Sequence, residues 1–411
     1  MRRGAVIACC APPVLLAVDF AVLSVAVPRM SAQLAMSGGE ARWLFSAYSL
    51  AFGCLLLAAG RAADSLGRRR LLVGGLLIFA AGAMVTALAA SGAVAIAGRA
   101  VQGAGAATMT PAALSLMTTT TREGDERNRV LAAYGLAISA GFVAGTLISG
   151  AIATVADWRL AVGAPSALAA LAAVAAWNLL PRDVAARAAP ASTPTLVVAT
   201  LVAGSALGAA VASPAGLVLA AAAALALVVL AARIAADRRR MAVACTAGLV
   251  VTGTGAAATL LLTLHLQDGQ GYSPLGAALV FACFGVAAIP GARVARRAPA
   301  GAAVGVGLGA QGAALLLAVA AGGSAPAIVA SVAGFGFGHV IGNASVAEIA
   351  TTGAAAARHG AIVGMLVTAQ YLGGTLGPSL LGRASFQIGM AVAGGIAVAT
   401  ALATWWSHAT A

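Results

Sequence analysis

The chain has 411 residues, of which 61% are hydrophobic and 9% are charged, and its mean hydropathy is +0.99. These charged groups are too few to form the surface of a water-soluble globular protein. The composition therefore excludes an ordinary soluble domain and predicts an integral membrane protein. The net charge of +13 comes from short arginine clusters between apolar runs. That pattern is typical of cytoplasmic membrane loops, and without a continuous basic patch interleaved with aromatics we expect no nucleic-acid partner.

The first apolar run, residues 4–27, follows two arginines at the start of the chain. It is long enough to cross a bilayer and carries Asp19 in its interior, so we expect an uncleaved first helix rather than a signal peptide. The five cysteines show no metal-ligand spacing. We therefore expect no metal and no other cofactor.

The predicted fold class is an all-α integral membrane protein with fourteen transmembrane helices, because each span needs about twenty mostly apolar residues. A polar linker, residues 181–194, separates the first six predicted spans from the rest. The spans are expected near residues 5–28, 43–60, 71–90, 92–118, 129–153, 159–180, 195–212, 215–235, 242–266, 274–292, 300–322, 325–352, 360–382 and 387–407.

Arginine placement indicates the orientation. With a cytoplasmic N-terminus, nineteen arginines fall in inside segments, four fall outside and Arg99 lies in the membrane. This excess follows the positive-inside rule. It predicts a multi-pass protein of the cell membrane with both termini in the cytoplasm.

Glycine and arginine landmarks repeat along the chain. The arginine cluster after the second span has an echo at residues 291–297, Gly103 and Gly105 correspond to Gly334 and Gly336, and a glycine series near residue 145 recurs near residue 377. Such a repeat predicts two six-helix halves with a binding site between them near mid-membrane. We expect an N-terminal half at 1–180, a linker with two inserted helices at 181–240, and a C-terminal half at 241–411.

Two local motifs carry the strongest family signal. Residues 60–70 read Gly-Arg-Ala-Ala-Asp-Ser-Leu-Gly-Arg-Arg-Arg, and Arg99 is followed by Gln102, Gly103 and Gly105 in the fourth span. These motifs resemble the major facilitator superfamily, specifically its fourteen-helix drug:proton antiporter branch. The resemblance covers essentially the whole chain and implies secondary transport.

The segment of residues 60–70 is predicted to be a cytoplasmic loop that acts as a gate between the second and third spans. Its glycines permit tight turns and its aspartate accepts hydrogen bonds, while the arginines stay among the headgroups. The alternative is a basic loop that only sets topology, although that role does not require the aspartate. The predicted gate residues are Gly60, Asp64, Gly67, Arg68, Arg69 and Arg70.

Arg99 and Asp19 are the predicted proton-coupling residues. A charge inside the membrane is costly and usually pairs or lines a wet path. Changing solvent access at Asp19 would switch its protonation, and the family resemblance supports a functional role there. The alternatives are a snorkelling Arg99 and a purely structural Asp19. Glu348 is either a second titrating group or a residue that reaches the cytoplasmic interface.

The fifth span resembles the antiporter signature, but Thr146 stands where the family has proline, which weakens the case for export over import. We expect its glycines and those of the thirteenth span to pack helices closely. The predicted packing residues are Gly103, Gly141, Gly145, Gly150, Gly373, Gly377 and Pro378.

Polar side chains suited to a substrate cavity are few, which suits lipophilic or amphipathic cargo. No sequence pattern of a hydrolase, zinc protease or phosphate-binding loop occurs, so we expect no enzymatic activity. The candidate cavity residues are Tyr48, Gln102, Tyr134, Asn343, Gln370 and Tyr371.

The sequence therefore predicts a proton-coupled exporter of small organic compounds that works by alternating access and acts as a monomer in the lipid bilayer. One alternative is an importer or exchanger that is not coupled to protons. Another is a membrane receptor or assembly protein without transport activity. The identity of the substrate stays open, because cavity shape decides it.

Overall fold

The computed structural model describes residues 3–121, 125–155, 157–181, 238–320, 324–351, 356–382 and 384–409. Within these ranges every regular element is helical, with twelve α-helices and one π-helical turn. Eight of the described helices are long and apolar enough to cross a membrane. The all-helical membrane fold is confirmed. The total of fourteen spans stays a prediction, since the linker and the two inserted helices lie outside the described residues.

The chain divides into two compact units, at 1–201 and 202–411. The described helices of the first unit are α1 (Arg3–Gln33), α2 (Gly38–Leu66), α3 (Arg68–Ala87), α4 (Gly92–Thr120), α5 (Asp125–Val155) and α6 (Trp158–Leu179). Those of the second unit are α9 (Arg238–Leu264), η1 (His265–Gly269), α10 (Pro274–Arg297), α11 (Ala300–Ala320), α12 (Ala325–Thr351), α13 (Ala356–Leu381) and α14 (Phe386–Ala409).

The ends of the first two helices follow local chemistry. α1 runs past Pro28 to Gln33, and its chain then turns at Ala35, whose φ of 48° is left-handed. α2 begins with a capping box, in which the Ser37 side chain accepts from the Glu40 amide and Glu40 accepts from the Ser37 amide. Hydrogen bonds from the Ser37 amide and hydroxyl lower the pKa of the exposed Glu40 carboxyl. The capping box thereby satisfies two of the four donors that a helix start leaves unpaired.

The segment of residues 60–70 is not the loop that the sequence predicted. α2 continues through residues 60–66, and the chain breaks only at Gly67, whose φ of 95° and ψ of 134° favour glycine. α3 begins at the next residue. Its Arg69 guanidinium donates to the Trp177 carbonyl and lies 4.4 Å over the Trp177 ring. The basic cluster therefore ties the start of α3 to the end of α6.

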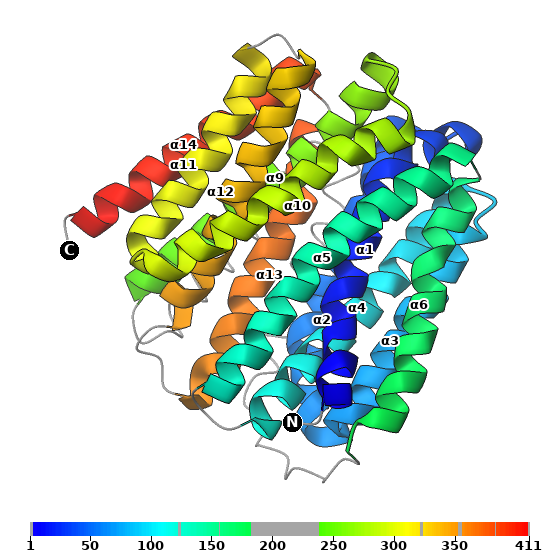
Figure 1. The fold of residues 1–411 in the computed structure, drawn as a ribbon, viewed down its shortest axis with the longest axis vertical. Coiled ribbons are helices and arrows are strands. Elements are labelled where there is room, and N and C mark those ends of the chain that lie inside the picture. Colours follow the sequence, from blue (N-terminus) through cyan, green and yellow to red (C-terminus); the bar gives the residue numbers. More distant parts are fainter. Residues whose placement is uncertain are drawn as a thin grey trace. The chain divides into compact units, whose positions relative to one another are not determined.

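Glycines let α3 and α4 approach at backbone distance. A Cβ on Gly75 would lie 2.6 Å from the Met109 amide nitrogen, and one on Gly105 would overlap the Phe79 amide. Gly103 faces the Tyr48 carbonyl of α2 in the same way. Small residues at such crossings are how membrane helices pack without a hydrophobic driving force. Figure 1 shows α4 beside α2 and α3, and α5 along α1.

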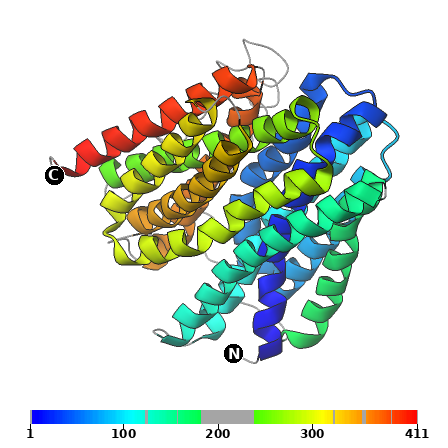
Figure 2. The same cartoon turned by 45° about the horizontal axis from the view of Figure 1, so that its top comes forward.

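The second unit repeats these pairings. α12 packs on α10 and α11, α13 packs on α9, and α14 lies beside α11 (Figure 2). Gly336 faces the Phe284 carbonyl and Gly338 faces the Gln311 amide. Gly336, and not Gly334, thus takes the place of Gly103, so the correspondence drawn from sequence spacing was out of register there.

The α9 and α13 crossing depends on the predicted packing glycines. Gly373 faces the Leu249 carbonyl, and Gly377 faces the Gly253 carbonyl, both too closely for a side chain. The neighbouring Pro378 lies inside α13.

We expect Gly67→Ala to lower the free energy of unfolding by about 1–3 kcal/mol, because alanine is strained at this backbone conformation. The measurement is thermal unfolding of the purified full chain in detergent. Gly74→Ala is the matched control, since a Cβ at Gly74 meets nothing within 4 Å. Equal stability of the two variants would contradict the expectation.

Candidate functional site

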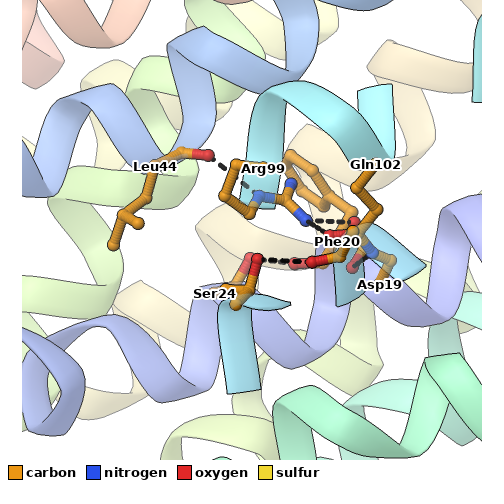
Figure 3. A network of polar contacts seen from close by, with 8 residues as sticks. Asp19, Phe20, Ser24, Leu44, Arg99 and Gln102 are labelled. Carbon is orange, nitrogen blue, oxygen red and sulfur yellow. Dashed lines mark hydrogen bonds and ion pairs between the residues drawn. The ribbon is translucent and has the colours of Figure 1, made fainter. Parts of the chain in front are cut away.

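A buried ion pair joins α1 to α4 at the centre of the first unit. Arg99 Nη1 donates to Asp19 Oδ2 at 2.7 Å. Asp19 is 4% exposed and Arg99 is 3% exposed. Figure 3 shows the Arg99 guanidinium between the Leu44 carbonyl and the Asp19 carboxylate. The structure thus brings together the two residues that the sequence predicted for proton coupling.

Gln102 bridges both members of the pair. Its Oε1 accepts from Arg99 Nη1 at 2.7 Å, and its Nε2 donates to Asp19 Oδ1 at 2.5 Å. Because Gln102 follows Arg99 by three residues on α4, both side chains project from one face of the helix. The three side chains form a closed ring of hydrogen bonds in which each carboxylate oxygen of Asp19 has a donor.

α2 provides the remaining contacts of Arg99. Nε donates to the Leu44 carbonyl at 3.0 Å, and the guanidinium lies 4.5 Å over the Tyr48 ring. A buried charge is tolerated when it is paired and its remaining donors are satisfied. The contacts from three helices meet that requirement and hold the guanidinium in a fixed orientation.

α5 supports the Asp19 segment of α1 from the opposite side. A Cβ on Gly145 would lie 2.6 Å from the Val18 Cα, and one on Gly141 would lie 3.0 Å from the Val14 Cα. Ser149 donates to the Val22 carbonyl at 3.4 Å. Thr146, which stands where the family has proline, bonds within α5 to the Phe142 carbonyl at 2.6 Å. The predicted packing glycines of the fifth span therefore position the residue next to Asp19.

A second polar junction joins the ends of α1 and α6. Gln33 Oε1 accepts from Trp158 Nε1 at 2.7 Å and from Arg159 Nη1 at 3.1 Å. Arg159 Nη2 also donates to the Ala89 carbonyl at 3.0 Å. Asp157 caps α6 through the Arg159 amide. These contacts fix the ends of the helices that frame the ion pair.

Four of the other predicted site residues lie in the second unit, namely Asn343, Glu348, Gln370 and Tyr371. Glu348 is exposed on α12 of the second unit. Asn343 and Gln370 bond to each other at 2.8 Å in that unit. Tyr134 and Tyr371 are half-buried, whereas for Gly60 and Asp64 the structure describes the backbone alone. Tyr48 and Gln102, expected in the cavity wall, contact Arg99 directly.

Sequence reasoning missed a polar cluster in the second unit. Gln311 Nε2 donates to the Val251 carbonyl at 3.0 Å and to Thr254 Oγ1 at 2.7 Å, and Gln311 is fully buried. Among the described residues, neither its Oε1 nor His339 Nδ1 has a hydrogen-bond partner. One signal was available, since Gln311 is a lone amide in an apolar span.

Removing one member of the ion pair should destabilise the chain more than removing both. We expect Asp19→Asn to cost about 3–5 kcal/mol, because it leaves the Arg99 charge buried without compensation. The double variant with Arg99→Gln should cost less than the two single variants added together. Thermal unfolding measures this cycle. Strict additivity would mean that the two groups do not interact in the folded protein.

Gly145→Ala should cost about 1–3 kcal/mol although it removes no polar group, since the added methyl must push α1 away from α5. Gly163→Ala is the matched control in the same unit, because its Cβ would make an ordinary contact of 3.4 Å with Ala87. Thermal unfolding of both variants measures the effect. An unfolding free energy for Gly145→Ala within 0.5 kcal/mol of the control, roughly the scatter of neutral substitutions, would argue against this positioning role.

Comparisons with known proteins agree with this architecture. The puromycin resistance protein pur8 of Streptomyces alboniger is 39% identical over 175 residues, or 42% of this chain and 34% of the relative. The cephamycin export protein CmcT of Amycolatopsis lactamdurans is 37% identical over 155 residues, or 38% and 32% of the two chains. The matched segments thus span about a third of each relative.

Solved structures share the fold at low identity. A POT-family transporter in complex with 5-aminolevulinic acid superposes with a TM-score of 0.80 at 12% identity, covering 98% of this chain and 95% of that one. The peptide transporter POT with alafosfalin gives a TM-score of 0.77 at 15% identity, with 98% and 93% covered. The family model of the Major Facilitator Superfamily matches residues 14–378. The chain therefore belongs to that superfamily, whose members are transporters and not enzymes.

Proposed function

We propose that the chain is a proton-coupled exporter of small, lipophilic or amphipathic organic compounds and that it works by alternating access. The observation that carries the proposal is the buried pair of Asp19 and Arg99, bridged by Gln102. An ionisable pair inside a membrane bundle is costly and marks a functional site by default. The resistance and export proteins among the relatives support export as the direction.

Protonation of Asp19 would convert a compensated pair into an uncompensated cation. The neutral carboxyl no longer balances the Arg99 charge, so the arrangement that joins α1, α2 and α4 loses stability. A conformation in which Arg99 reaches water or another partner is then favoured, which is how one proton shifts a two-state equilibrium. Release of the proton on the other side restores the pair.

The predicted gate acts at the junction of α2 and α3. Gly67 gives the chain a sharp break, and Arg69 ties α3 to Trp177 of α6. In this proposal Asp64 and Arg68 set the rate of conformational exchange rather than substrate affinity. The chain lies in the cell membrane with both termini in the cytoplasm, and the fourteen-helix antiporter branch is the proposed subgroup.

Everted membrane vesicles test the coupling. With an imposed pH gradient, we expect wild-type vesicles to lose part of the gradient when a transported compound is added, because export takes protons in exchange. The compound panel should include puromycin and lincomycin, because one relative is named a puromycin resistance protein and another a lincomycin resistance protein. Asp19→Asn should abolish the response. Asp157→Asn is the matched control, since it removes an exposed carboxylate in the same unit and asparagine still caps a helix.

Two outcomes would contradict the proposal. Asp19→Asn vesicles that accumulate a compound against its gradient as fast as wild type would exclude Asp19 as the coupling residue. Failure of every compound in a broad panel to dissipate the gradient would favour an importer or an uncoupled exchanger.

A further inference from the structure

We propose that the polar cluster around Gln311 in the second unit is a binding site for the hydroxyl group of a neutral lipophilic compound, such as an alkylphenol or alcohol. The cluster, termed the Gln311 site, comprises Val251, Thr254, Gln311 and His339, with the Phe284 and Phe335 rings as its walls. This assignment rests on the proposed function, since it names the class of compound that the exporter would carry.

The orientation of the Gln311 amide is fixed by its partners. Nε2 donates to the Val251 carbonyl at 3.0 Å and to Thr254 Oγ1 at 2.7 Å, and Thr254 in turn donates to the Val250 carbonyl at 2.7 Å. A flipped amide would place its oxygen against the carbonyl, which cannot donate. Oε1 is therefore the atom without a partner, and it is an acceptor.

His339 presents a second buried polar atom. Its ring lies beside Gly255 of α9 and against the Phe335 ring. A neutral imidazole donates from one ring nitrogen and accepts at the other. Nδ1 is buried and has no hydrogen-bond partner among the described residues. The Gln311 acceptor and this ring nitrogen both lie near one segment of α9, and buried polar atoms of this kind require an explanation.

The surrounding charge selects a neutral donor. In the described part of the second unit the acidic residues are Asp268 and Glu348, and both side chains are exposed. A cationic group placed against Gln311 would therefore find no buried anion among the described residues of this unit, and burying it unpaired costs several kcal/mol. A hydroxyl supplies the missing donor without adding charge.

The Phe284 and Phe335 rings suit the apolar part of a ligand that carries this hydroxyl group. The Phe284 and Phe335 ring centroids lie 4.9 Å apart and stand 5.7 Å and 5.5 Å from the His339 ring. Phe284 and His339 are half-buried, whereas Gln311 and Phe335 are buried. An aromatic ligand that reached Gln311 would meet aromatic side chains beside it.

Packing glycines hold the Gln311 site in place. Gly336 of α12 abuts the Phe284 carbonyl, Gly338 of α12 abuts the Gln311 backbone amide, and Gly255 of α9 leaves only a hydrogen atom beside the His339 ring. Glycines of α9 and α12 therefore fix three members of the site. The equivalent position in the first unit has an ion pair instead: Gly145 packs against Val18, the residue before Asp19, whereas Gly377 packs against Gly253, the residue before Thr254.

The test uses 4-butylphenol and its methyl ether, 4-butylanisole, which has the same apolar body and no hydrogen-bond donor. Binding of each labelled compound to the purified full chain in lipid nanodiscs is measured by equilibrium dialysis, with empty nanodiscs subtracted. We expect the phenol to bind ~10-fold more tightly than the ether, the scale of one hydrogen bond to a buried acceptor. Equal affinities would overturn the inference.

Substitutions of the site residues test whether the phenol binds at the Gln311 site. Gln311→Met keeps the side-chain length and removes the acceptor, so it should reduce the phenol affinity to that of the ether. His339→Leu should weaken phenol binding as well, and it answers the same question if Gln311→Met fails to fold. Ser331→Ala is the matched control on α12, because it removes a buried hydroxyl that bonds to the Ala314 carbonyl outside the site. Unchanged phenol binding in both site variants would overturn the inference.

Asp19→Asn separates this inference from the proposed function. The variant should bind 4-butylphenol as wild type does, because Asp19 belongs to the other unit. Selective phenol binding without any proton-coupled export would leave the Gln311 site standing and contradict the proposed function. Export without Gln311-dependent phenol binding would contradict the site alone.

Discussion

The requirement to keep a buried charge compensated governs the first unit. Arg99 lies 3% exposed among apolar helices, and water is not available there to solvate it. Protein groups replace the hydration of its guanidinium with an ion pair, hydrogen bonds and a ring contact. These groups are Asp19, Gln102, the Leu44 carbonyl and the Tyr48 ring. Since these groups come from α1, α2 and α4, the pair fixes how three helices pack.

Glycine makes this arrangement possible. Polar side chains can meet only if their backbones come close, and Gly103 and Gly145 bring α2 and α5 to within backbone contact of their neighbours. Dispersion forces and close packing are the main attraction between helices in lipid. The same residues that hold the bundle together therefore also set the geometry of the ion pair.

The two units use one helix-packing scheme with different chemistry at its centre. The first has the ion pair of Asp19 and Arg99. The second has an uncharged cluster around Gln311, in which Thr254 takes the place of Asp19 beside the crossing glycine. One packing scheme thus encloses an ion pair in one unit and an uncharged polar cluster in the other.

The sequence by itself determined the membrane class, the superfamily and the pairing candidates, because hydropathy and a single intramembrane cation are local properties that need no coordinates. It also identified the glycines that must pack. Only the tertiary structure decided that Gln102 bridges Asp19 and Arg99, that α2 stays helical to Leu66, and which glycine of α12 faces α10. Those outcomes depend on distances between residues far apart in the chain, and spacing along one helix does not encode them.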